Sequence, residues 1–374
     1  MLKIVLGATA MLALFHLYFW RGKSGVIDYI YFAALLIVMG LNSYNADYEA
    51  YEKMYQGASN ATSLWEIMQV HPDKGYVLLN WLASLIGMNF VGFRFMLFAL
   101  SLGIIFVLAK RLGAPISLIY LVYLTYPMFM DIIQVRNFII SVVVFLSVYC
   151  YARAEIKWYI IGVVALLISV TIHPFTLIFI PFIVFYKVYH SRRFRMITYI
   201  PIGLGLLSIV IKMLIDAYWT EVTAILTVLT DWAARGHSYV GYQVLTSRQF
   251  KIYLVVVIFT WLLYKAKNYL SDLESVTDIQ KRFVELSFSA YLYLICWMPF
   301  FALNINLATR MPRDLFLLAY ISLGIYIQKC TKEKEKWGIV FGMLFLAFFF
   351  GLVDLYIGSE RFNVNVIIKN NLLL

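Results

Sequence analysis

Charged residues are scarce in this 374-residue chain, where they make up 14% of the sequence against 63% for hydrophobic residues. The mean hydropathy is +0.82. A water-soluble domain of this size needs far more polar surface, so the predicted solvent is the lipid bilayer. No polar stretch is long enough to bury a core of its own, and we therefore expect a single transmembrane domain over residues 1–374.

Cysteine is also rare, and familiar catalytic motifs are missing. Cys150, Cys296 and Cys330 lie in or beside apolar runs without paired or metal-ligand spacing, which predicts packing residues and excludes a disulfide framework. The absence of HExxH, DxD, Ser-His-Asp and Cys-His signatures argues against proteases, lipases and metal-dependent glycosyltransferases. No glycine-rich nucleotide motif is present either. We therefore expect neither a metal nor a cofactor.

Long apolar runs are abundant and predict an all-α, polytopic membrane protein with about twelve transmembrane helices. The runs lie at 2–20, 26–42, 92–109, 115–130, 137–152, 158–173, 175–189, 196–215, 250–264, 284–303, 314–328 and 337–357. A thirteenth run, 76–88, is too short to span comfortably and predicts a re-entrant or interfacial segment.

The formal charge of +11 reflects basic clusters that recur after every second apolar run, which assigns them to the cytoplasm. Such spacing indicates membrane orientation, so no nucleic-acid partner is expected. The outer loops are then about 43–75, 216–249 and 304–313, provided that 76–88 does not cross and the N-terminus is outside. Aromatic residues in 216–249 predict an amphipathic helix on the outer surface that forms a partial lid.

The first candidate site lies in the outer loop 43–75. Asp47 is followed by Tyr48, Tyr51 and Tyr55 at helical spacing, and together with Tyr44 these make one aromatic face. We expect this helix to lie flat on the bilayer. Aromatic faces stack on sugars and acids bind sugar hydroxyls, although an interfacial anchor would show the same pattern. Asp47 is the preferred catalytic candidate.

Two further candidates stand where apolar helices begin or end. Arg136 and Asn137 open one helix after Asp131, an arrangement that suits phosphate oxygens unless Arg136 pairs with Asp131 as a structural tether. His173, followed by Pro174, ends another helix on the outer side, where it could donate to phosphate, shuttle a proton or only cap the helix.

The fourth candidate is the loop 304–313, which carries Arg310 and Arg313 outside, against the positive-inside trend. Arginines of this kind suit a diphosphate, and the alternative is a salt bridge from Arg313 to Asp314 or another loop acid. Further outward positive charge comes from Arg235, His237 and Arg248. Together these outer residues suit an anionic lipid headgroup that bears sugars.

At these residues the sequence resembles the EpsG group of Wzy-type polysaccharide polymerases, which make O-antigen, capsule and exopolysaccharide. Three stretches carry the resemblance: Asn45 to Tyr51 followed by Lys74-Gly75-Tyr76, then Gln134 to Asn137, and then Ile172 to Phe175. Their order matches the family over roughly residues 40–185. The family more often has glutamine after the arginine and a small polar residue after the histidine, where this chain has Asn137 and Pro174.

The resemblance implies a glycosyltransferase of the bacterial cytoplasmic membrane that joins undecaprenyl-diphosphate-linked oligosaccharide units at the outer face. Its implied partners are that lipid, the membrane lipids and a chain-length regulator. Such an enzyme must stabilise the negative charge that develops on the leaving group and accept the proton of the acceptor hydroxyl. The expected catalytic residues are Asp47 as the base, Arg136 and His173, and the expected substrate-binding residues are Tyr48, Tyr51, Asn137, Arg235, His237, Arg248, Arg310 and Arg313.

Three other functions remain open from the sequence. A flippase or other transporter of lipid-linked oligosaccharide would want charges along a central path and two related halves, and neither is evident. A glycosyltransferase that uses a polyprenyl-phosphate sugar would present a similar outer acid, usually with a soluble outer domain. A structural membrane protein would not need outward arginines.

Overall fold

The computed structural model describes residues 2–19, 25–191, 195–217, 247–301, 305–356 and 364–372. Within these residues every regular element is a helix, which confirms the predicted all-α class. Arg235, His237 and most of the surface helix expected in 216–249 lie outside the described residues. Arg248 lies in the first turn of a helix, and its side chain is also outside the description.

The first half of the chain forms eleven of the helices that the structure describes. They are α1 (Leu2–Phe19), α2 (Ile27–Gly40), α3 (Tyr48–Asn60), α4 (Leu64–Val70), α5 (Lys74–Leu85), α6 (Phe90–Arg111), α7 (Ile116–Thr125), α8 (Met128–Ile133), α9 (Val135–Ala152), α10 (Ile156–Ile172) and the 3-10 helix η1 (Pro174–Phe179).

The second half continues the bundle. Its described helices are α11 (Phe182–His190), α12 (Arg195–Ala217), α15 (Ser247–Ser271), α16 (Asp278–Cys296), α17 (Met298–Phe301), α18 (Ile305–Lys329), α19 (Glu333–Gly351), the π-helix η2 (Leu352–Tyr356) and α20 (Val364–Lys369).

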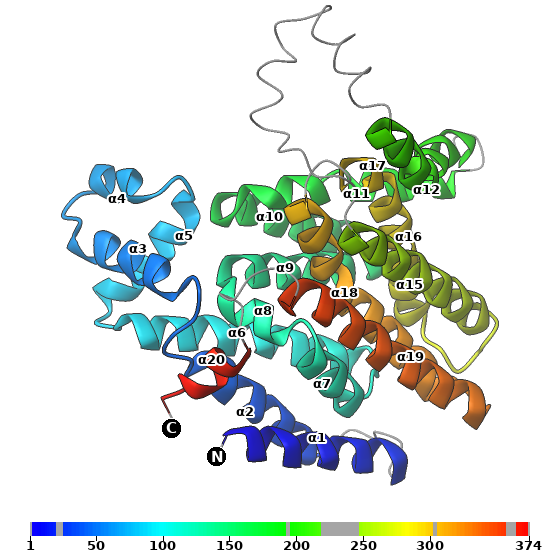
Figure 1. Ribbon diagram of the computed structural model, residues 1–374, viewed down its shortest axis with the longest axis horizontal. Helices are drawn as coiled ribbons and strands as arrows, with labels where there is room; N and C mark the ends of the chain where they lie inside the picture. The colour runs from blue at the N-terminus through cyan, green and yellow to red at the C-terminus, as the bar shows by residue number, and fades with distance from the viewer. Residues whose placement is uncertain are drawn as a thin grey trace, which may run out of the picture.

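The bundle is built around α9, which contacts α6, α10, α16 and α18. Figure 1 shows α1 and α2 along one side of it, α15 to α19 on another, and α3 to α5 together as a separate lobe. The chain end returns to the start of that lobe, where Asn42 donates to the carbonyl of Ile367 at 2.9 Å. Segments far apart in the sequence therefore meet where α2 leads into α3.

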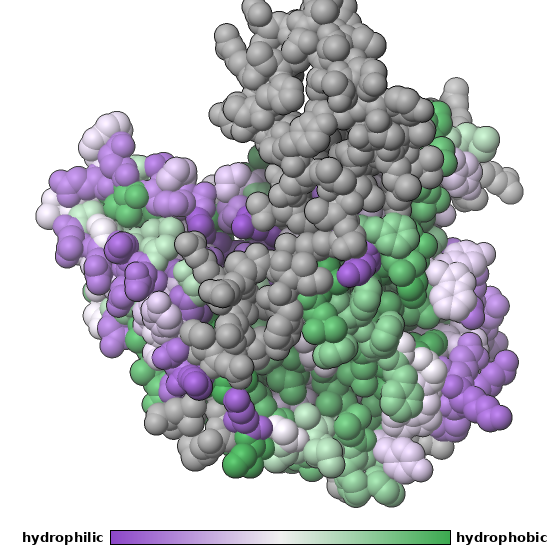
Figure 2. Space-filling view, in the orientation of Figure 1, coloured by the Kyte–Doolittle hydropathy of each residue, from purple (hydrophilic) through white to green (hydrophobic). Residues whose placement is uncertain are grey.

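Several helices carry apolar side chains on their outer surface. On α19, Phe341, Phe345 and Phe348 are more than half exposed. Figure 2 shows hydrophobic residues over α18 and α19 and hydrophilic residues gathered on the α3–α5 lobe. Exposed apolar faces of this extent suit contact with lipid.

Four of the described helices are long and apolar enough to cross a membrane, namely Phe90–Arg111, Val135–Ala152, Gln249–Ser271 and Glu333–Asp354. The count of twelve spans stays a prediction, because other expected spans are shorter or interrupted. The run 115–130 is split into α7 and α8, since Pro127 holds Tyr126 in an extended conformation. The run 175–189 is likewise divided between η1 and α11 at Pro181.

The short run 76–88 forms α5, which has 12 residues and is therefore about 18 Å long. It packs against α3, α4 and α10. A helix of this length does not reach across about 30 Å of hydrocarbon. It belongs to the polar lobe.

Two expectations for the outer segments are wrong. The aromatic face of α3 does not lie free at a bilayer surface, because Tyr48, Tyr51 and Tyr55 are buried against α5 and α6. The expected loop 304–313 is helical from Ile305 onward as the start of α18. Hydropathy ends a predicted span at the first charges, whereas here Arg313 lies inside the bundle beside Asp131 and Asp354.

Candidate functional site

Arg136, in the first turn of α9, is bound to an acid that the sequence analysis did not single out. Its Nη1 donates to Oδ2 of Asp73, the residue that precedes α5. Asp73 stands at the N-cap position but makes no capping bond, so its carboxylate is available for the arginine. The guanidinium also lies over the rings of Tyr51 and Tyr76, at 5.4 and 5.8 Å from their centroids. The alternative that Asp131 tethers Arg136 is therefore wrong.

A glycine brings this pair close to the end of α10. A Cβ atom at Gly75 would lie 2.9 Å from the carbonyl carbon of Thr171, so α5 and α10 approach closely only because glycine is there. Gly75 is two residues after Asp73, and Thr171 is two residues before His173. The Lys-Gly-Tyr stretch of the sequence thus has a packing role that positions the site.

His173 caps η1 and is held as a neutral ring. Its Nδ1 accepts the backbone N–H of Phe175 at 3.2 Å, which leaves the proton of the neutral imidazole on Nε2. Burial, and then the nearby charges of Arg136 and Arg310, lower the pKa of His173 to about 4. At neutral pH the side chain can therefore donate one hydrogen bond but carries no charge.

Asp47 precedes α3, and its backbone N–H donates to Oδ1 of Asn45 at 3.1 Å. Its carboxylate makes no hydrogen bond or ion pair within the part of the chain that the structure describes, and it is half-buried. Burial raises the pKa of Asp47, and the charges of Arg310, Arg136 and Arg313 oppose that shift. A carboxylate in this state suits the acceptance of a proton.

Arg310 completes the group from the first turns of α18. Its charge acts on both Asp47 and His173, which places the three side chains in one electrostatic neighbourhood. Among the described residues it forms no ion pair, and it is partly exposed. Four residues that the sequence analysis predicted for the site, namely Asp47, Arg136, His173 and Arg310, thus influence one another electrostatically, and their roles stay predictions.

Arg313 and Asn137 lie deeper, where no substrate reaches them in this conformation. The side chain of Arg313 has no exposed area and lies 4.0 Å from Asp131 and 3.6 Å from Asp354. Asn137 donates to Oδ1 of Asp314 at 2.6 Å. Both residues belong to a buried network, and their predicted role in substrate binding stays a prediction. The alternative of a salt bridge from Arg313 to Asp314 or another loop acid is met in altered form, because Arg313 pairs with acids that are distant in the sequence.

Tyr48 and Tyr51 were also predicted to bind substrate, and both are buried. The Tyr51 ring supports Arg136, and the Tyr48 ring lies 4.9 Å from the guanidinium carbon of Arg94. A ring face of this kind favours a cation above it. The tyrosines of α3 therefore hold arginines in place.

Two site residues were missed, and both come from the stretch before α5. Asp73 binds Arg136, and Nδ1 of His71 accepts the backbone N–H of Asp73 at 3.1 Å. His71 also adds to the lowering of the pKa of His173. The signal in the sequence was an acid and a histidine within four residues of the Lys-Gly-Tyr stretch.

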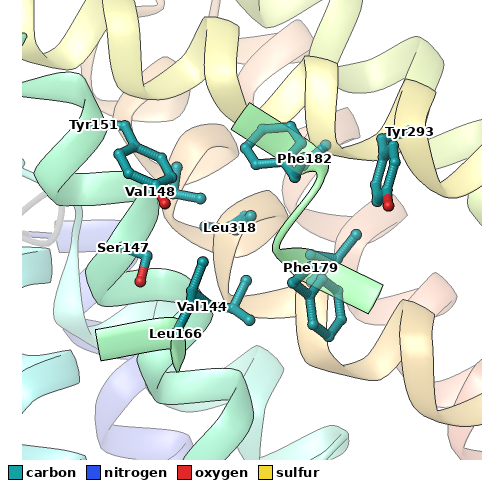
Figure 3. Close-up of a pocket in the computed structure, with 11 residues that line it drawn as sticks. Val144, Ser147, Val148, Tyr151, Leu166, Phe179, Phe182, Tyr293 and Leu318 are labelled. Atoms are coloured by element: carbon teal, nitrogen blue, oxygen red, sulfur yellow. The ribbon is translucent and has the colours of Figure 1, made fainter. Parts of the chain in front are cut away.

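Two cavities among the described residues are lined by other side chains. Figure 3 shows one between Tyr151, Phe182 and Tyr293, with a volume of about 10 Å³, which is about the space of one water molecule. It separates packed helices and cannot hold a sugar or a lipid. The described residues also contain no group of three or more His, Cys, Asp or Glu side chains placed to hold a metal.

The described helices expose hydrophobic faces, and one polar site contains two arginines, two acids and two histidines. These features define a helical membrane protein with a charged site. The EpsG family model matches residues 26–366, and the chain therefore belongs to the EpsG family, whose members are membrane proteins related to exopolysaccharide synthesis. The match confirms the resemblance and extends it well beyond residues 40–185. No curated protein and no solved structure matches the chain significantly.

Proposed function

We propose that this protein is a polysaccharide polymerase that joins undecaprenyl-diphosphate-linked oligosaccharide units at the outer face of the bacterial cytoplasmic membrane. Family membership supports a role in polysaccharide synthesis. The observation that carries the proposal further is that the charges of Arg136 and Arg310 act on both Asp47 and His173. Glycosyl transfer from a lipid diphosphate needs both a base and cationic stabilisation of the leaving group.

In the proposed reaction, the bond between the anomeric carbon of the donor sugar and its diphosphate oxygen breaks. A bond forms between that carbon and a hydroxyl oxygen of the acceptor unit. Asp47 takes the hydroxyl proton, and undecaprenyl diphosphate leaves with the negative charge.

The cations of the site would stabilise that developing charge without a metal. Arg310 has no acidic partner among the described residues, and Arg136 can exchange its contact with Asp73 for a phosphate oxygen. His173 adds a hydrogen bond from Nε2. The membrane topology in this proposal is the predicted one, with about twelve spans and the α3–α5 lobe outside.

The test uses purified protein in liposomes with extracted lipid-linked oligosaccharide, and the products are separated on a gel. Wild type should give a ladder of polymer. Arg136→Ala should weaken donor binding, whereas Asp47→Asn should bind donor normally and lower turnover by about 10²–10⁴-fold. Arg153→Ala is a matched control, because Arg153 pairs with Glu155 at the other end of α9 and should not affect the ladder.

Two outcomes would contradict the proposal. The absence of a ladder, with transbilayer movement of the same lipid, would make the protein a transporter. A loss of donor binding in Asp47→Asn with normal binding in Arg136→Ala would reverse the two roles.

A further inference from the structure

Arg94, in the second turn of α6, is a buried arginine for which no described residue supplies an acidic partner. Its side chain is 1% exposed, and in the described structure no carboxylate pairs with it. Its Nε makes no hydrogen bond there. Because an unpaired charge inside a membrane helix is costly, such a residue is expected to have a specific function.

The donors of Arg94 reach two different segments of the chain. Nη1 donates to the carbonyl oxygen of Asn42 at 2.6 Å, just beyond the end of α2. Nη2 lies 3.5 Å from the carbonyl oxygen of Ile132, at the end of α8. Both carbonyls stand at helix ends, where the helix itself offers no partner. The first segment leads to Asp47 and the second leads to Arg136.

The guanidinium is held in this position by aromatic rings. The ring centroids of Tyr48, Phe90 and Phe98 lie 4.9, 5.8 and 5.8 Å from its central carbon. These contacts partly replace the missing counter-ion. They also restrict the plane of the guanidinium, so its two donating nitrogens stay directed at the two segments.

A chain of hydrogen bonds links Arg94 to Asp47. Asn45 Nδ2 donates to Oδ1 of Asn42 at 2.8 Å, and Oδ1 of Asn45 accepts the backbone N–H of Asp47 at 3.1 Å. Asn45 Nδ2 also lies 3.4 Å from the same Ile132 carbonyl that Arg94 contacts. The turn before α3 and the end of α8 are therefore joined at one point.

We propose that Arg94 is a positioning residue that fixes Asp47 and Arg136 relative to each other. This inference rests on the proposed function, in which the two residues act on opposite sides of one transfer. Arg94 is too buried to touch substrate. A small misplacement of reacting groups lowers the rate strongly, so the clamp controls turnover.

The first test measures polymerisation in liposomes by Arg94→Met and Arg94→Lys at saturating donor. Methionine removes the charge and all donors, and lysine keeps the charge but lacks the planar fork that reaches two carbonyls. We expect kcat to fall by roughly 10- to 100-fold in both variants, with little change in KM for the donor. Wild-type kcat in both would overturn the proposal.

The matched control is Lys110→Met, at the other end of the same helix. Lys110 Nζ lies 3.5 Å from the buried carboxylate of Asp28 and 5.0 Å from the ring centroid of Tyr29. Its loss should lower thermal stability but leave kcat per folded molecule unchanged. If Lys110→Met lowers kcat as much as Arg94→Met, the effect follows stability, and the positioning role is refuted.

The second test does not depend on activity. Spin labels are placed at Tyr44→Cys and Phe129→Cys, one in each segment, after Cys150, Cys296 and Cys330 have been replaced by serine. The distance distribution between the labels should be narrow with Arg94 and in the Lys110→Met control, and broad with Arg94→Met. Equal widths in all three would refute the clamp. A wild-type protein that makes no ladder would refute the proposed function, and the distances would still report on Arg94.

Discussion

Two clusters of charge include residues from the start of α9, and they use arginine differently. In the candidate site, Arg310 has no described acidic partner and Arg136 has one, and both are partly exposed. In the network below it, Arg313 is buried between Asp131 and Asp354. Tyr123 and Tyr126 donate to those two acids at 2.7 and 2.6 Å. Exposed cations with few partners suit ligand binding, and buried cations with several partners suit structure.

We expect the greatest loss of stability when Arg313 is replaced, because it lies between two buried acids. Arg313→Met removes the cation that lies beside two buried carboxylates, so we expect a loss of about 3–5 kcal/mol in the free energy of unfolding. Thermal unfolding of the purified protein in detergent measures this, and Arg313→Lys should lose less because the charge is kept. A variant that is as stable as wild type but does not bind donor lipid would show that Arg313 is a ligand after all.

A smaller effect, on binding, is expected at Arg310. Arg310→Ala should weaken donor affinity by about 10- to 100-fold, because one charge-assisted contact to phosphate is lost. The unfolding temperature should change little, since no described acid is left unpaired. The measurement is KM for the lipid-linked donor, with Arg310→Lys as the variant that keeps charge without bidentate geometry. A large fall in stability with unchanged affinity would place Arg310 in the structural network.

These two arginines also show where sequence reasoning succeeds and where it stops. Both occur in one short outer stretch and were assigned the same role, yet one helical turn separates an available side chain from a buried one. The acids that hold Arg313 lie far away in the sequence, at Asp131 and Asp354, and hydropathy cannot pair them. By contrast, Asp47, Arg136 and His173 were predicted from their sequence order to share a site, and in the structure the charge of Arg136 acts on the other two.

The fold was predictable in class and less so in detail. Apolar composition dictates a helical membrane protein, but a window of hydropathy passes over Pro127, which divides one expected span into α7 and α8. Asp73 was missed for a different reason. A single acid before a helix is usually a cap. The contact of Asp73 with Arg136 depends on tertiary packing, including the close approach of α5 to α10 at Gly75, which the sequence does not show.

His173 should make the free energy of unfolding depend weakly on pH. Its pKa of about 4 in the folded protein is below the ordinary value of about 6.5, so the unfolded chain binds a proton first as the pH falls. The stability that neutral His173 contributes is present above about pH 6.5 and is lost as the pH falls toward 4.

Between pH 7 and 5, wild type should therefore lose about 1 kcal/mol more stability than His173→Gln, after allowance for partial exposure to solvent. Thermal unfolding of both proteins at the two pH values measures the difference, in which other titrating groups cancel. A larger loss in His173→Gln than in wild type would mean that His173 is charged in the folded protein, and its Nδ1 could then not accept the backbone N–H of Phe175.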